Sequence, residues 1–198
     1  SAVGRMYPGL FGNTAGSGAA VGGGGTAPVG SAAGAISGAV GSNNIPVSAL
    51  FSITRSSESG NRQIDPATGK PITSSAGAIG IMQVMPDTGP EAAKLAGVAW
   101  DPAKYRNDSA YNQKIGEAYL TKQFNDFGGD PAKAWAAYNA GPGALSKAIQ
   151  AAQKSGTPDA WLTKLPKETQ DYVAKNVAQL GQQLPDFAKT RRTTESAA

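Results

Sequence analysis

From residue 46 onward, proline and glycine divide the sequence into short segments, and this punctuation limits every element that the chain can form. Proline favours the first position of a helix, and glycine favours the position just past its last turn. Leu50 with Ile53, and Val173 with Val177, have the spacing of a buried helix face. The sequence therefore predicts a mainly α (α+β, lysozyme-like) fold, a compact bundle of short helices with one irregular loop region.

The same signals place the individual elements. We expect helices over residues 46–58, 91–95, 108–127, 131–139, 144–153 and 160–162, and a last helix from Pro166. Asp130-Pro131 combines an N-cap with proline at the first helical position. Asp101-Pro102 is expected to begin a connecting loop. Residues 63–75 contain turn-forming residues, and the flanks of this segment could pair as a small hairpin or flap.

The composition changes near residue 43 and again near residue 185. Residues 1–42 are rich in Gly, Ala and Ser, a composition that cannot bury enough apolar surface to offset the entropy of ordering. We expect a flexible arm there, either a plain tail or an assembly-docking segment that uses Tyr7, Leu10 and Phe11. Residues 43–184 form the predicted globular domain, and residues 185–198 a frayed polar tail.

Two missing residue types exclude whole classes of enzyme. The chain has no Cys and no His, which excludes cysteine nucleophiles, Ser-His triads and His-ligated zinc sites. Proton transfer would have to come from Glu, Asp, Lys or Tyr. The formal net charge of +4 is scattered, which argues against nucleic acid as a partner. We find no apolar run of transmembrane length and no evident signal peptide.

Glu58 stands at the predicted C-terminal end of the first helix, just before Gly60. The partial negative charge of a helix C-terminus disfavours an ionised carboxylate, and apolar surroundings would also raise its pKa. A carboxylic acid that keeps its proton near pH 7 can act as a general acid. The alternative from the local sequence is an ordinary solvated glutamate in a last turn.

Four short motifs together resemble the lytic transglycosylase domain of the soluble lytic transglycosylase type, a relative of goose-type lysozyme. They appear in the family's order and span about residues 45–180: Glu58-Ser59-Gly60; Gly80-Ile81-Met82-Gln83-Val84-Met85-Pro86; Ala137-Tyr138-Asn139-Ala140-Gly141-Pro142-Gly143; and Glu168-Thr169-Gln170-Asp171-Tyr172-Val173. The segment between Glu58 and Gly80 is longer than in the family's compact members, so it could act as a flap or dock on a partner.

The resemblance implies that Glu58 is the single catalytic acid/base and that Tyr138 can hydrogen-bond it. Gln83 would line the sugar cleft, although a core amide that binds backbone is an alternative. Asn139 is a substrate contact or a helix cap, and Tyr172 is a cleft tyrosine or a core one. The remaining expected substrate-binding residues are Ser74, Met82 and Met85, and Ser59 is expected to support the loop.

The implied activity is cleavage of the MurNAc-β-1,4-GlcNAc bond of peptidoglycan with formation of a 1,6-anhydro end, without metal or cofactor. A hydrolytic muramidase would need a second carboxylate, for which Asp65 and Asp87 are the nearest candidates in sequence. A non-catalytic wall-binding or structural module is the alternative outside enzymes. The arm favours a bacteriophage virion protein that binds tail or ejection-protein subunits through residues 1–42; a periplasmic bacterial enzyme is the alternative setting.

Overall fold

The computed structural model describes the backbone of residues 45–195 and the side chains of residues 45–183, so the predicted arm at residues 1–42 lies outside the described part. The described chain is mainly helical, which confirms the predicted fold class. The helices are α2 (Val47–Ser59), α3 (Gly89–Leu95), α4 (Pro102–Asn107), α5 (Ser109–Asp126), α6 (Pro131–Ala140), α7 (Pro142–Lys154), the 3-10 helix η1 (Pro158–Lys164) and α8 (Lys167–Glu195).

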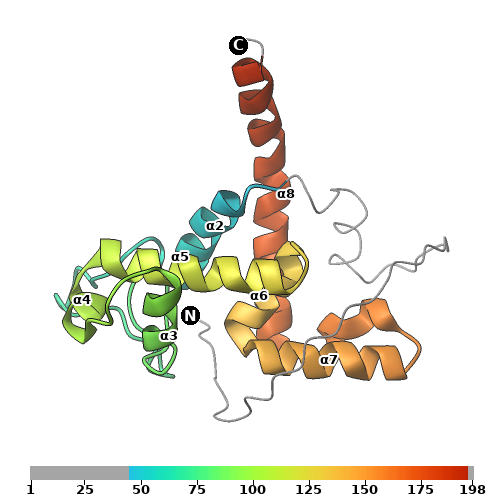
Figure 1. The fold of residues 1–198 in the computed structure, drawn as a ribbon, viewed down its shortest axis with the longest axis horizontal. Coiled ribbons are helices and arrows are strands. Elements are labelled where there is room, and N and C mark those ends of the chain that lie inside the picture. Colours follow the sequence, from blue (N-terminus) through green and yellow to red (C-terminus); the bar gives the residue numbers. More distant parts are fainter. Residues whose placement is uncertain (1–44, 196–198) are drawn as a thin grey trace.

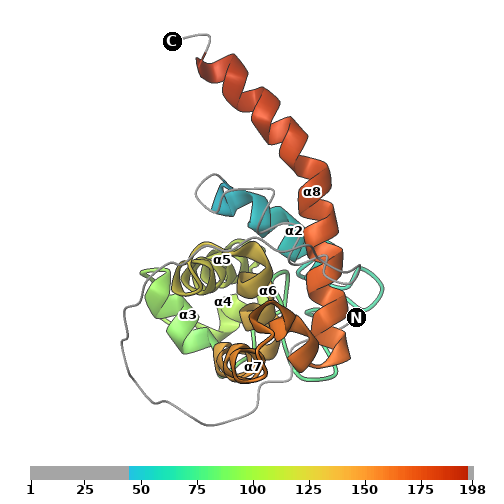
Figure 2. The same cartoon turned by 90° about the vertical axis from the view of Figure 1, so that its right-hand side faces the viewer.

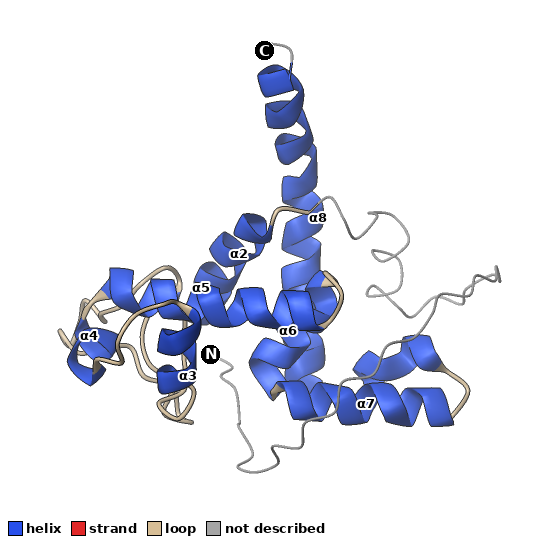
Figure 3. Cartoon of the chain, viewed as in Figure 1, coloured by secondary structure: helices blue, strands red, loops and turns tan. Residues whose placement is uncertain are grey.

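Helices α5 and α6 form the middle of the bundle (Figure 1). Helix α2 packs on α5 and α8, and α6 packs on α8 and α7. Helices α3 and α4 lie at the other end of α5, beside the irregular loop that follows α2 (Figures 1 and 3). Turning the molecule shows α2 and α8 running close together on one side (Figure 2). None of the helices in residues 45–195 combines the length and apolar character needed to cross a bilayer.

The interior contains two groups of buried apolar side chains. The larger one surrounds Trp135 between α2, α6, α7 and α8, and the indole nitrogen of Trp135 donates to Thr54 Oγ1 at 2.9 Å. The smaller one surrounds Met82 and Ile115, between the irregular loop and α3, α4 and α5. Tyr138 packs against both groups, so the end of α6 lies at their junction.

Aspartate N-caps start three successive helices. Asp101, Asp108 and Asp130 each accept hydrogen bonds from two backbone N–H groups of the next helix, which satisfies donors that a helix start leaves unpaired. The prediction of a connecting loop at Asp101-Pro102 is therefore wrong. That pair is an N-cap followed by proline at the first helical position, and it starts the short helix α4.

The loop between α2 and α3 has antiparallel bridges in place of full strands. Ile64 pairs with Pro71, and Ile79 pairs with both Thr73 and Val84. The flanks of the predicted hairpin do meet: the Ile72 N–H donates to Gln63 O and the Asp65 N–H to Lys70 O, each at 2.9 Å. The flap is therefore present as a bridged turn that is too short to count as a strand pair.

Helix α8 is longer than predicted. Its backbone stays helical through Pro185 to Glu195, so the expectation of a frayed tail from Pro185 is wrong over that stretch. A proline inside a helix removes one hydrogen bond and costs about 3 kcal/mol. The Gln, Ala, Lys and Arg residues on both sides of Pro185 are good helix formers that offset part of this cost.

Candidate active site

Glu58 lies in the last turn of α2, where the chain turns sharply into the irregular loop. Gly60 has a left-handed backbone (φ 64°), and its N–H donates to Ser56 O at 3.1 Å. The Asn61 N–H donates to Arg55 O at 3.1 Å, which completes a glycine-type helix end. This geometry ends the helix just past Glu58, whose side chain is only 6% exposed.

The surroundings of Glu58 favour its neutral form. Burial raises the pKa of Glu58 from 4.5 to about 8, while a hydrogen bond from Tyr172 and the positive charge of Lys175 act in the opposite direction. Desolvation is the largest of these effects, because a buried carboxylate loses its hydration without a directly paired cation. At pH 7 most Glu58 side chains therefore keep their proton.

Tyr172 is the hydrogen-bond partner of Glu58. Its hydroxyl donates to Glu58 Oε1 at 2.6 Å, and its side chain is 6% exposed. Tyr138, for which the resemblance implied this bond, donates to Met82 O at 2.8 Å instead. Tyr138 is nevertheless close enough to the acid to feel its charge. Burial, and then the negative charge of Glu58, raise the pKa of Tyr138 well above its usual value. The structure thus brings Glu58, Tyr138 and Tyr172 together.

Gln83 sits in a strained turn directly after Met82, the residue that accepts from Tyr138. Its backbone is left-handed (φ 49°), a conformation that costs a non-glycine residue energy and is often found at functional sites. Its side-chain amide nitrogen donates to Gly80 O at 2.8 Å and to Ile72 O at 3.2 Å, and the residue is 5% exposed. This is the geometry of an amide that holds backbone, so contact with a sugar stays a prediction.

Ser74 and Asn139 also bind protein groups. Ser74 Oγ accepts from the Ala78 N–H at 3.0 Å and closes the turn before Ile79. Asn139 is buried near the end of α6, and its Oδ1 accepts from Thr169 Oγ1 of α8 at 2.7 Å. The Asn139 amide nitrogen is buried without a partner among the described groups, so Asn139 keeps a donor available.

The two methionines of the second motif differ in burial. Met82 is fully buried, and a Cβ added at Gly116 of α5 would come within 2.4 Å of the Met82 side chain. Met82 is therefore a packing residue, and its carbonyl oxygen accepts the hydrogen bond from the Tyr138 hydroxyl. Met85 is half-buried, and its contribution to a sugar cleft stays a prediction.

Ser59, Gln63 and Asn112 hold the loop in place. Ser59 Oγ donates to Ile81 O at 2.8 Å, which fits the expected loop-supporting role. Gln63 Nε2 donates to Arg106 O at 2.8 Å, and its Oε1 accepts from the Ile81 N–H at 2.8 Å. Asn112 Oδ1 accepts from the Met82 N–H at 3.0 Å. The sequence reasoning missed Gln63 and Asn112. A polar residue near an otherwise apolar helix face was the available signal for Asn112, and the loop residue Gln63 gave no such signal.

The carboxyl groups of Glu117, Asp65 and Asp87 are paired, engaged in a turn or exposed. Glu117 of α5, which the sequence reasoning also missed, pairs with Arg55 at 2.5 Å. Asp65 Oδ1 accepts from the Ala67 N–H in the loop, and Asp87 is exposed. Within the described residues, no three acidic side chains gather as a metal-binding group. The site therefore offers one buried carboxyl group.

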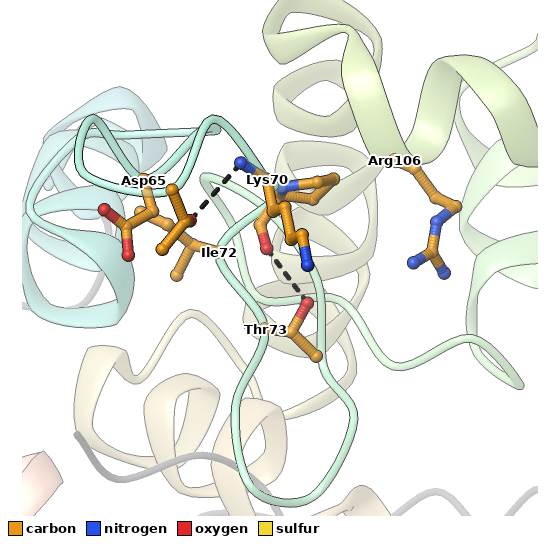
Figure 4. Close-up of a pocket in the computed structure, with 7 residues that line it drawn as sticks. Asp65, Lys70, Ile72, Thr73 and Arg106 are labelled. Carbon is orange, nitrogen blue, oxygen red and sulfur yellow. Dashed lines mark hydrogen bonds between the residues drawn. The ribbon is translucent and has the colours of Figure 1, made fainter.

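A separate pocket of about 470 Å³ lies between the loop and Arg106 of α4 (Figure 4). Lys70 and Arg106 both extend toward it, and neither forms an ion pair with a described residue. Thr73 Oγ1 donates to Pro71 O at 3.1 Å, and both residues line the pocket. The pocket is lined by the loop between α2 and α3 and by Arg106 of α4.

Comparison with known families places this geometry in context. The sequence model of the Transglycosylase SLT domain matches residues 38–160. The chain belongs to this family. The matched range includes Glu58, Gln83 and Tyr138, and it ends before Tyr172.

Solved lytic transglycosylases share the fold. An inactive glutamate-to-glutamine mutant of lytic transglycosylase Slt from Pseudomonas aeruginosa is 27% identical over 70% of this chain, with a TM-score of 0.53. The 70 kDa soluble lytic transglycosylase from Escherichia coli is 28% identical over 69% of this chain, with a TM-score of 0.55. The SLT domain chain spans only 22% and 21% of those two chains, about a fifth of their length.

Proposed function

We propose that this SLT domain is a peptidoglycan lytic transglycosylase that cleaves the MurNAc-β-1,4-GlcNAc bond through Glu58. The observation that carries the proposal is the buried Glu58 carboxyl group, whose pKa of about 8 keeps it protonated at neutral pH. A group with this pKa can give up a proton and take one back near pH 7. Membership of the family and the names of the solved relatives support the same activity.

In the first step Glu58 donates its proton to the glycosidic oxygen. The bond between C1 of MurNAc and that oxygen breaks, and GlcNAc leaves with a free hydroxyl. The oxygen of the 2-acetamido group of MurNAc attacks C1 and carries the positive charge as a cyclic oxazolinium ion. No carboxylate nucleophile of the protein is required for this step, unlike in most glycosidases.

In the second step the Glu58 carboxylate removes the proton of the C6 hydroxyl of the same sugar. The C6 oxygen attacks C1, the oxazolinium ring opens, and a 1,6-anhydro end forms. The nucleophile is tethered to the sugar that it attacks, so the step gains from intramolecular proximity. Glu58 ends the cycle protonated, and Tyr172, which donates to Oε1, orients the carboxyl group in both steps.

The arrangement of carboxylates favours this reaction over hydrolysis. An inverting glycosidase places its second carboxylate roughly 6.5–9.5 Å from the first, and a retaining one roughly 5–5.5 Å. The charged or hydrogen-bonding groups that act on the pKa of Glu58 are Tyr172 and Lys175, and neither is a carboxylate. Of the two candidates for activating water, Asp65 is engaged in the loop turn and Asp87 is exposed.

Mass spectrometry of muropeptides tests the proposal directly. Purified peptidoglycan is digested with the wild-type protein and with Glu58→Gln, which preserves the size of the side chain. We expect anhydro-muropeptides from the wild type alone. Reducing-end products, one water heavier, would overturn transglycosylation in favour of hydrolysis and direct attention to Asp65 and Glu117. No products, where a known muramidase is active, would favour a binding module.

The finer part of the proposal concerns the setting. We place the enzyme in a bacteriophage virion, where it opens the wall locally during genome delivery and attaches to tail or ejection-protein subunits through residues 1–42. The support is compositional: a Gly-, Ala- and Ser-rich arm carries Tyr7, Leu10 and Phe11 near its start. Co-purification of the full chain, but not of residues 43–198, with particle subunits is the expected result.

A further inference from the structure

Two consecutive residues at the end of α2 are hydrogen-bonded to α8. Glu58 Oε1 accepts from Tyr172 at 2.6 Å, and Ser57 Oγ donates to Asn176 Oδ1 at 2.5 Å. Tyr172 and Asn176 are four residues apart on one helix, so their side chains lie on the same face, one turn from each other. Tyr172 therefore binds the acid Glu58, and Ser57, the residue before Glu58, binds Asn176 in the next turn of α8.

Asn176 is fully buried, and only half of its amide has a hydrogen-bond partner. Its oxygen accepts from Ser57, while its amide nitrogen meets no acceptor at hydrogen-bond geometry among the described groups. Buried donors are normally paired, so an exception calls for an explanation. Ser57 Oγ donates to the amide oxygen, so the N–H groups of Asn176 point away from Ser57.

The Tyr172 hydroxyl is the group on which this amide acts. Burial and the negative charge of Glu58 raise the pKa of Tyr172 well above its usual value, and the Asn176 side chain lowers it. A group that lowers the pKa of a phenol stabilises negative charge on its oxygen, as an N–H donor does. Tyr172 lies one turn from Asn176 on the same face of α8, and its hydroxyl gives its one hydrogen to Glu58, so its oxygen lone pairs can accept from the unpaired N–H groups of Asn176.

We propose that Asn176 is a positioning residue that keeps Tyr172 a hydrogen-bond donor to Glu58 and so leaves the acid proton on the other carboxyl oxygen, Oε2. The proposal rests on the proposed role of Glu58. A phenolic hydroxyl can donate or accept. If Tyr172 accepted from Glu58, the acid proton would be buried between the two side chains and withheld from a glycosidic oxygen. An N–H donor beside the phenol polarises its O–H toward Glu58 and opposes that arrangement.

Other charged or titratable groups near Glu58 come from four helices. Lys175 on α8 lowers the pKa of Glu58, and Tyr138 on α6 feels its charge. Arg55 on α2 is paired with Glu117 on α5. None of these groups hydrogen-bonds to Asn176, so replacing Asn176 leaves their described contacts intact.

The test compares Asn176→Leu, which keeps the bulk of the side chain, with the wild type. The pKa of Glu58 is followed by ¹³C NMR of labelled carboxyl groups, and kcat and KM are measured on peptidoglycan strands. Without Asn176 the bond from Tyr172 weakens, so the pKa of Glu58 should rise. We expect kcat to fall about threefold to tenfold, the scale of one lost hydrogen bond, with KM unchanged. Ser57→Ala should also raise the pKa of Glu58 and lower kcat, by smaller amounts than Asn176→Leu.

Gln123→Leu is the matched control, because Gln123 is another buried amide with one unpaired atom, on α5. It should lower stability without moving the pKa of Glu58. Equal effects of the two substitutions, or a Glu58 pKa unchanged in both Asn176→Leu and Ser57→Ala, would overturn the proposal. If Asn176→Leu does not fold, Ser57→Ala decides. The NMR titration does not need activity, so an inactive wild type would refute the proposed function separately.

Discussion

Replacing Glu58 by Gln should make the protein more stable, and by an amount that depends on pH. Folding moves Glu58 from water into a site that raises its pKa from 4.5 to about 8. Below pH 4.5 the group is neutral in both the folded and unfolded states, so it carries no penalty. As the pH rises from 4.5 to 8 the unfolded state ionises first, and stability is lost progressively until the folded state also ionises.

The magnitude follows from the same shift. One pKa unit corresponds to about 1.4 kcal/mol, so the raised pKa of Glu58 costs the wild type about 5 kcal/mol of unfolding free energy above pH 8. At pH 7 the cost is about 3 kcal/mol by the same conversion. The substituted glutamine would keep an oxygen that accepts from Tyr172, so Glu58→Gln removes the ionisation penalty and keeps the contact.

Urea unfolding of the wild type and Glu58→Gln between pH 4.5 and 9 measures this difference. The two unfolding free energies should be similar near pH 4.5 and diverge toward pH 8, with the variant the more stable. Glu91→Gln, at an exposed carboxylate of α3, controls for the loss of one negative charge. A difference between wild type and Glu58→Gln that stays constant across this range would refute the assignment of Glu58 as a buried, neutral acid.

Three further predictions concern the same site. The rate kcat/KM should decline as the pH rises above about 8, because Glu58 then loses the proton that it must donate; a pH–rate profile checks this. Tyr172→Phe should raise the pKa of Glu58 and lower kcat about tenfold, as NMR titration and kinetics would show. Gly80→Ala should destabilise the protein by about 1–3 kcal/mol in urea unfolding, because Gly80 has φ 85° and an added Cβ would meet Gln63 Oε1 at 2.4 Å. Gly97→Ala is the control: Gly97 has φ 66° but open space around it, so this variant measures the backbone strain alone.

Local signals allowed the sequence to predict most of the helices. Asp108 and Asp130 are the N-caps of α5 and α6, and Gly60 ends α2 directly after Glu58 and Ser59. Each of these boundaries depends on a few neighbouring residues, so it can be read from the chain. The same rule was available at Asp101-Pro102, where α4 was missed because its six residues include little apolar periodicity.

The contacts inside the site depend on distant parts of the chain and were predicted less well. Glu58 and Tyr172 are 114 residues apart, and nothing local determines which tyrosine reaches the acid. The family resemblance implied that Tyr138 makes this bond, but the Tyr138 hydroxyl donates to Met82 O instead. The bond between Tyr172 and Glu58 forms because α8 packs against α2, and the periodicity of either helix alone does not reveal this contact.

The Gln63 amide has a consequence for how this domain can vary. Gln63 ties the base of the loop to α4 and to Ile81, and the Ile64–Pro71 bridge closes the base above it. Residues 66–70 beyond that closure are exposed. The tip can therefore be exchanged or lengthened at little conformational cost, since loop entropy grows slowly with length. Residues 66–70 are a suitable place to graft a peptide that directs the domain to another surface, because Glu58 and Tyr172 would keep their positions.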